Sequence, residues 1–96
     1  MGDEQLATEI LNAFFQDTPR QIEELRVLLE NGEAQACGRQ AHSIKGAAAN
    51  VGGERLRQVA LEMEKAGDAG DLNAVAAGMD GLEASFLEFQ AEAVLR

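Results

Sequence analysis

The 96-residue chain contains no tryptophan, no tyrosine, one proline, one cysteine and one histidine. Residues that favour strands are sparse, whereas alanine, leucine and glutamate are plentiful, so the composition favours an all-helical fold. The single cysteine cannot form an internal disulfide, which makes a reducing cytoplasm the simplest expected location. The single histidine cannot by itself provide the several ligands that a metal site requires.

Long apolar runs are also missing. No run approaches the roughly 18 residues that a membrane-spanning helix needs. The N-terminal segment MGDEQL is acidic and has no apolar signal region. Position 6 is leucine, so the initial Met-Gly does not match the myristoylation pattern. We therefore expect no membrane contact by this domain.

Basic residues are few, with 8 Lys and Arg against 17 Asp and Glu and a formal net charge of −9. Such an excess of negative charge argues against binding to nucleic acid. The acidic residues are unevenly distributed, because residues 34–53 contain none. Four cations lie in or just after this window: Arg39, Lys45, Arg55 and Arg57. Chance clustering is one interpretation, and a local site that tolerates an anion is the other.

Length and composition predict a single domain over residues 1–96. A chain of this size can build one modest core. With 46% hydrophobic and 26% charged residues, the composition is that of a globular rather than a disordered chain. There is no internal repeat, low-complexity tract or long linker that would divide it.

The N-terminal third predicts two helices separated at Thr18-Pro19. Residues 5–15 have the spacing of a short amphipathic helix, with three apolar positions expected to face inward: Leu6, Ile10 and Phe14. Thr18 suits an N-cap, Pro19 suits the first helical position and Gln21 suits the partner position of a capping box. The second helix would then end at Asn31-Gly32.

The rest of the chain predicts three further helices. One begins near Glu33 and ends at Gly52-Gly53, and the next runs from about Glu54 to Ala66. Residues 67–70 are expected to form a turn, after which Asp71 can cap the last helix. We therefore expect an all-α fold, an antiparallel up-and-down four-helix bundle with a short extra N-terminal helix.

The segment AHSIKGAAAN, residues 41–50, places the only histidine on the outer face of its helix. The expected buried stripe consists of Cys37, Ala41, Ile44, Ala48 and Val51. At about 100° per residue, His42 points roughly 140° away from the centre of that stripe, and Gly46 points almost directly outward. A glycine in an exposed helix costs roughly 1 kcal/mol relative to alanine. We interpret Gly46 as room for another protein to approach His42.

The chemistry open to this histidine is narrow. Cys37 lies on a different helix face, so the two side chains cannot share a metal or form a nucleophile pair. Adjacent helical positions do not face each other, which also separates His42 from Ser43. No glycine-rich loop lies between a strand and a helix to bind a nucleotide. A nucleophile that carries a phosphoryl group is the role that fits best, because a cation is near and carboxylates are absent from the segment.

The segment AHSIKGAAANVGGERL resembles the signature of histidine-containing phosphotransfer (Hpt) domains of multistep two-component phosphorelays. The likeness extends from the second predicted helix to the last. It implies that His42 accepts a phosphoryl group, that Lys45 neutralises the group and that Gly46 admits a receiver domain. It also implies that Glu64, on the following helix, bonds the other imidazole nitrogen. The alternative for Glu64 is a plain solvated helix residue.

The docking face that the resemblance implies lies on the outer half of the histidine helix. Five residues are expected to contribute to it: Gln35, Arg39, Gly46, Ala49 and Asn50. Its expected partners are response-regulator receiver domains, with a hybrid sensor kinase as a further candidate. No cofactor is expected on this chain, because Mg²⁺ would be held by the receiver. We expect a monomer without kinase activity of its own, either free or excised from a hybrid sensor kinase.

Several alternatives stay open beside the phosphorelay intermediate. The phosphotransfer domain of a chemotaxis-type kinase has the same bundle and often a glutamate partner. The dimerisation domain of histidine kinases fits poorly, because an acidic residue typically follows the histidine there and Ser43 follows it here. A different kind of function is that of a structural or adaptor bundle in which the histidine is inert. An enzyme with its own small substrate fits worst, because no pocket chemistry is visible.

Overall fold

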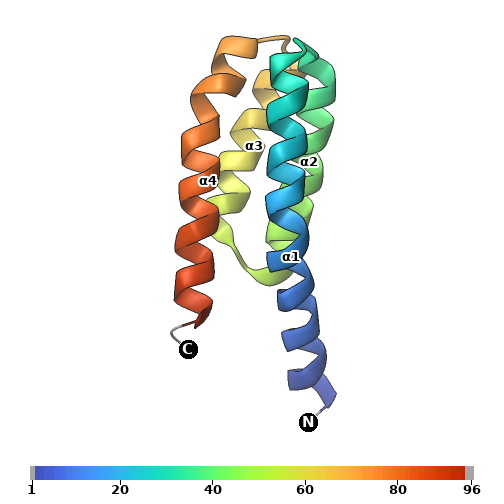
Figure 1. Ribbon diagram of the computed structural model, residues 1–96, viewed down its shortest axis with the longest axis vertical. Coiled ribbons are helices and arrows are strands. Elements are labelled where there is room, and N and C mark those ends of the chain that lie inside the picture. The colour runs from blue at the N-terminus through green and yellow to red at the C-terminus, as the bar shows by residue number, and fades with distance from the viewer. Residues whose placement is uncertain (1, 95–96) are drawn as a thin grey trace.

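The computed structural model describes residues 2–94, and the side chains of residues 4–93 (Figure 1). Within this range the chain forms four helices: α1 (Gly2–Glu30), α2 (Ala34–Val51), α3 (Glu54–Asp68) and α4 (Leu72–Val94). They run alternately up and down around one core (Figure 1). The predicted all-α, four-helix architecture is therefore confirmed.

The prediction of a separate N-terminal helix is wrong. Helix α1 is continuous from Gly2 to Glu30, with Pro19 in its interior. Thr18 is fully buried and Gln21 lies in mid-helix, so neither residue caps a helix start. An interior proline costs about 3 kcal/mol. Burial of a Phe or Ile side chain contributes about 1.5–3 kcal/mol each, and the buried face continues across the proline from Phe14 to Ile22.

The inward assignment of Leu6 and Ile10 is also wrong. Their side chains are 56% and 46% exposed, and Phe14 is the first residue of α1 in the core. The reason is the length of α1, whose first turns extend beyond the loop between α2 and α3 (Figure 1). At this end of the bundle the neighbouring helices cover the apolar face only in part: Ile10 borders a shallow hollow beside α2 and stays nearly half exposed.

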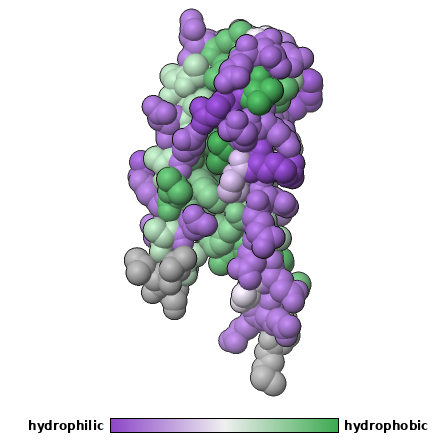
Figure 2. Space-filling model, in the orientation of Figure 1, coloured by the Kyte–Doolittle hydropathy of each residue, from purple (hydrophilic) through white to green (hydrophobic). Residues whose placement is uncertain are grey.

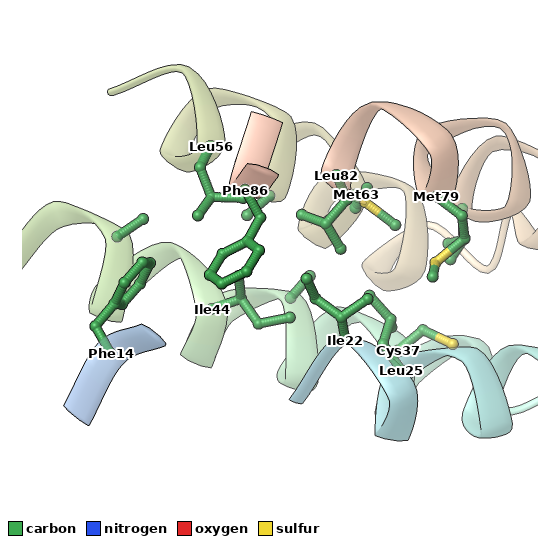
Figure 3. Packing of buried hydrophobic residues seen from close by; sticks show 14 residues of the cluster. Phe14, Ile22, Leu25, Cys37, Ile44, Leu56, Met63, Met79, Leu82 and Phe86 are labelled. Carbon is green, nitrogen blue, oxygen red and sulfur yellow. The ribbon is translucent and has the colours of Figure 1, made fainter. Parts of the chain in front are cut away.

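The core runs along the inner faces of all four helices (Figure 3). Four residues of the stripe predicted for α2 are buried in it: Cys37, Ala41, Ile44 and Ala48. The fifth, Val51, packs at its edge, as do Leu28, Leu29, Val59 and Phe89. Four phenylalanines join α1 to α4, with the rings of Phe14 and Phe15 centred 5.8–6.2 Å from those of Phe86 and Phe89. In the view of Figure 2, polar side chains cover α1, and apolar atoms are exposed over α4.

The helix ends are set by local chemistry, largely as predicted. Gly32 and Gly52 adopt positive φ angles of 73° and 75°, a conformation that favours glycine and ends α1 and α2. The Ala74 N–H donates to Asp71 Oδ1 at 3.0 Å, which confirms Asp71 as the cap of α4. No helix among residues 2–94 is both long enough and apolar enough to cross a membrane.

Helices α2 and α3 approach each other closely at Gly38 and Gly67, which are both buried. A Cβ atom on Gly67 would lie 2.7 Å from the carbonyl oxygen of Ala34, and one on Gly38 would lie 2.5 Å from Asp68 Oδ1. The predicted turn at residues 67–70 is therefore wrong at its first two residues, because α3 continues to Asp68. Gly67 belongs to α3, where it permits a close helix crossing rather than a change of chain direction.

Candidate functional site

His42 lies on the solvent face of α2, and its side chain is 64% exposed. Its position follows from the opposite face, where Cys37, Ala41 and Ile44 are buried in the core. Gly46, one turn further along, is also exposed, and a Cβ atom built there would meet nothing within 4 Å. The surface beside the imidazole is therefore low and open.

Glu64 on α3 contacts both polar side chains of the predicted site. Its Oε2 atom is 2.8 Å from His42 Nδ1, and its Oε1 atom is 2.6 Å from Lys45 Nζ. Glu64 and Lys45 are mostly buried, with side chains 18% and 24% exposed. One carboxylate thus bridges an imidazole and an ammonium group, although the three residues come from two helices.

The helix crossing at Gly38 and Gly67 explains how Glu64 reaches α2. Glu64 lies one turn before Gly67 on α3, and His42 lies one turn after Gly38 on α2. Because the antiparallel helices are closest at the two glycines, the side chains one turn away face each other across a short gap. The pairing of His42 with Glu64 is thus a consequence of backbone packing.

The ionisation of Glu64 suits a hydrogen-bond acceptor. The Lys45 ammonium group lowers the pKa of the Glu64 carboxyl most strongly, burial opposes this, and the contact with His42 lowers the pKa further. A carboxylate accepts hydrogen bonds and cannot donate them, so His42 Nδ1 is the donor. In a neutral imidazole the other nitrogen, Nε2, then carries the free lone pair.

This arrangement can perform nucleophilic chemistry on an open surface. Nε2 is at the far edge of the ring from Glu64 and is not engaged by any side chain of residues 4–93. Within the same residues, no three His, Cys, Asp or Glu side chains are grouped so that they could hold a metal ion. The main surface hollows are lined by residues other than His42, Lys45 and Glu64.

A family model described as the Hpt domain matches residues 9–92. The chain belongs to the Hpt domain family. A comparison with curated proteins gave no significant match. Hpt domains are phosphotransfer modules that take part in histidine phosphotransfer in phosphorelays and interact with receiver domains. The family resemblance of the histidine segment is thereby confirmed over nearly the whole chain.

The predicted docking residues of this Hpt domain share one face of α2. All five are exposed: Gln35, Arg39, Gly46, Ala49 and Asn50. Asn50 also lines a shallow hollow between α1 and α2, together with Ile10 and Ala47. The structure therefore brings these residues together on the surface around His42, and their part in docking stays a prediction.

Sequence reasoning missed one relationship in the Hpt site, the ion pair between Lys45 and Glu64. It assigned Lys45 to the phosphoryl group and Glu64 to the imidazole, as if the two were independent. Lys45 lies one turn after His42, on the side of α2 that faces α3. This position is a weak signal that a residue of α3 could bind Lys45. Which residue does so depends on the helix crossing, and no local pattern carries that information.

Proposed function

We propose that this Hpt domain is a phosphorelay intermediate. His42 accepts a phosphoryl group from the phosphoaspartate of one receiver domain and passes it to a second response-regulator receiver. The observation that supports the proposal best is the exposed His42 ring, with Nδ1 held by Glu64 at 2.8 Å and Nε2 left open. A ring held in this way presents its lone pair to an incoming phosphorus atom.

The transfer step follows from that tautomer. The Nε2 lone pair attacks phosphorus, the phosphorus–oxygen bond to the aspartate breaks, and the receiver regains its carboxylate. Because Nδ1 keeps its proton, the phosphorylated ring carries a positive charge, which the Glu64 carboxylate stabilises. In the second transfer an aspartate carboxylate of the second receiver attacks phosphorus, the phosphorus–nitrogen bond breaks, and the ring leaves as neutral imidazole. Phosphohistidine and acyl phosphate both have high transfer potential, so the step runs in either direction.

The two proteins divide the catalytic parts between them. Lys45 lies beside the ring and offsets the charge of the phosphoryl group, and Gly46 leaves space for the receiver. The receiver supplies the Mg²⁺ ion and the acidic residues that hold it, as phosphoryl transfer generally requires. This division accounts for the lack of Asp and Glu in residues 34–53, because carboxylates there would repel the acidic site of the receiver.

The docking face is the exposed side of α2 around His42. Gln35 and Arg39 precede the histidine, whereas Ala49 and Asn50 follow it beyond Gly46. Small side chains after the histidine keep that half of the face low, which suits close approach of a folded partner. We expect the domain to act as a monomer in the cytoplasm, free or within a hybrid sensor kinase, without kinase activity of its own.

The decisive experiment mixes the domain with phosphorylated receiver domains and follows the label. We expect an acid-labile, base-stable label on His42 alone, and its loss in His42→Gln, with helical content unchanged by circular dichroism. Full labelling of His42→Gln would overturn the proposal. An inert adaptor bundle would take no label at all. A chemotaxis-type domain would be labelled by a kinase and ATP rather than by a receiver.

A further inference from the structure

Arg39 differs from the other cations of the structure. The chain has 8 Lys and Arg residues, of which Arg96 is outside the described range. Six of the remaining cations lie within 4.0 Å of a carboxylate: Arg20, Arg26, Lys45, Arg55, Arg57 and Lys65. Among residues 4–93, only Arg39 has no such partner. In a chain of net charge −9, a cation without a carboxylate partner calls for an explanation.

The position of Arg39 relates it to the imidazole. It is exposed and lies three residues before His42 on α2, which is one helical turn, about 4.5 Å along the axis and about 60° around it. Both side chains are exposed, so they lie on the same solvent-facing half of α2. Cβ atoms at this spacing are about 5–6 Å apart, well within the length of an arginine side chain.

The charges of the site leave a role for a second cation. A phosphoryl group adds about two negative charges near neutral pH. The protonated ring and Lys45 each contribute one positive charge, but Glu64, 2.6 Å from Lys45, removes one of them. About one negative charge remains on the phosphorylated site, and Arg39, one turn away on the same face, is a cation without a carboxylate partner among residues 4–93.

We propose that Arg39 binds the phosphoryl group of phosphorylated His42. Its planar guanidinium donates hydrogen bonds to the phosphoryl oxygens from the side opposite Lys45, a geometry for which arginine is well suited. The role is that of a phosphate-binding residue that stabilises the phosphorylated state. This inference rests on the proposed function of His42, and it assigns Arg39 to the phosphoryl group rather than to the receiver surface.

The test uses the intact domain without any receiver, phosphorylated by phosphoramidate. In that reaction Nε2 of His42 attacks phosphorus, the phosphorus–nitrogen bond of the donor breaks, and ammonia leaves. Phosphorus NMR then follows the pH titration of the phosphoryl group. In Arg39→Ala, we expect the midpoint to move to higher pH by about half a unit, a threefold change in proton affinity, because a nearby cation favours the dianion. The difference between the midpoints of Arg39→Ala and the wild type should shrink in 1 M salt, because charges further apart than about 3 Å are then largely screened.

Two further variants control the result. Arg39→Lys keeps the charge and should retain most of the wild-type titration. Arg55→Ala removes an exposed arginine that pairs with Glu88 on α4, away from His42, so it should titrate like the wild type. An equal shift in Arg55→Ala would show an effect of net charge alone and would overturn the proposal.

The proposed function and this inference fail in different ways. If Arg39 serves the receiver instead, Arg39→Ala leaves the phosphorus titration unchanged and raises the KM for the receiver, which overturns the inference but not the relay. If phosphorylated receivers never label wild-type His42, the relay is wrong, whatever the titration shows. A wild-type domain that takes no phosphoryl group on His42 from either donor would overturn both.

Discussion

Helix α2 carries two glycines in opposite surroundings. Gly38 is buried against α3, where its missing side chain lets two backbones approach. Gly46 faces solvent, and nothing lies within 4 Å of the place where its Cβ would be. Each glycine weakens the isolated helix by about the same amount, roughly 1 kcal/mol relative to alanine. On the inner face close packing offsets that loss, whereas on the outer face nothing within the folded domain does.

The contrast between the two glycines indicates different roles for the buried and the exposed face of α2. The inner face serves the fold, and through the crossing with Gly67 it also brings Glu64 to His42. The outer face is kept low at the expense of helix stability, which fits the proposed approach of a receiver domain. Substitutions on the two faces should therefore change different measurements.

The largest effect on stability is expected for Gly67→Ala. Its new methyl group would overlap backbone atoms of Gly38 and Ala34, which cannot move aside as a flexible side chain can. We expect the free energy of unfolding to fall by about 1–3 kcal/mol, although alanine is the better helix former. Urea unfolding measures this change. A variant as stable as the wild type would show that α2 and α3 are further apart than described here.

Gly46→Gln should slow phosphotransfer without destabilising the domain. The position is exposed and glutamine is a better helix former than glycine, so the domain should stay folded with a melting temperature at or above that of the wild type. The bulky side chain should obstruct the receiver and slow phosphotransfer by at least about tenfold, equivalent to about 1.4 kcal/mol of lost transition-state stabilisation. Transfer kinetics with one receiver measure the effect. Transfer at the wild-type rate would mean that close approach is not the reason for this glycine.

Glu64→Ala tests the hydrogen bond by which α3 holds the His42 ring. Loss of one orienting hydrogen bond, worth about 1–1.5 kcal/mol, should slow transfer roughly tenfold. Glu64→Gln is the matched control, because its amide oxygen still accepts from Nδ1–H while the negative charge beside Lys45 is removed. Circular dichroism should show unchanged helical content in both variants. If Glu64→Ala transfers like the wild type, the ring needs no such partner.

Gly46→Ala should stabilise the free domain by up to about 1 kcal/mol, because alanine is the better helix former and the new methyl group meets no other atom. Paired with Gly67→Ala, it makes the same substitution in two surroundings with opposite expected signs. Thermal unfolding of the two variants side by side checks this. A destabilised Gly46→Ala would contradict the open surroundings of Gly46.

The smallest expected effect is a dependence of stability on pH. The folded state lowers the pKa of Glu64 below its ordinary value of 4.5, chiefly through Lys45. The resulting stabilisation is fully present above that value and is lost as the pH falls through the lower, folded pKa. It should be below about 1 kcal/mol. The measurement is unfolding of wild type and Glu64→Gln from pH 7 to pH 3, where the gap between them should narrow on acidification.

Features with causes within a few neighbouring residues were predictable from the sequence. The helix ends at Gly32 and Gly52 and the cap at Asp71 follow from backbone conformation and local hydrogen bonding. The outward placement of His42 and Gly46 follows from the buried stripe of their own helix, since the helical repeat alone determines which residues share a face.

Other features depended on which segments meet in space. Pro19 has the local signal of a helix start, but burial on both sides of it keeps α1 continuous. Leu6 and Ile10 have an amphipathic spacing, yet both stay about half exposed because the neighbouring helices cover this end of α1 only in part. Gly67 has the local signal of a turn residue, but its role in α3 is to let the backbone of α2 pack closely against it.

The candidate site divides in the same way. That a lone histidine, a lysine and a glycine share one exposed segment free of carboxylates follows from the sequence, because helical spacing and composition are local properties. That Glu64 binds both His42 and Lys45 depends instead on how the helices pack. That contact joins residues on two helices, and its geometry is set by how closely the backbones cross at Gly38 and Gly67.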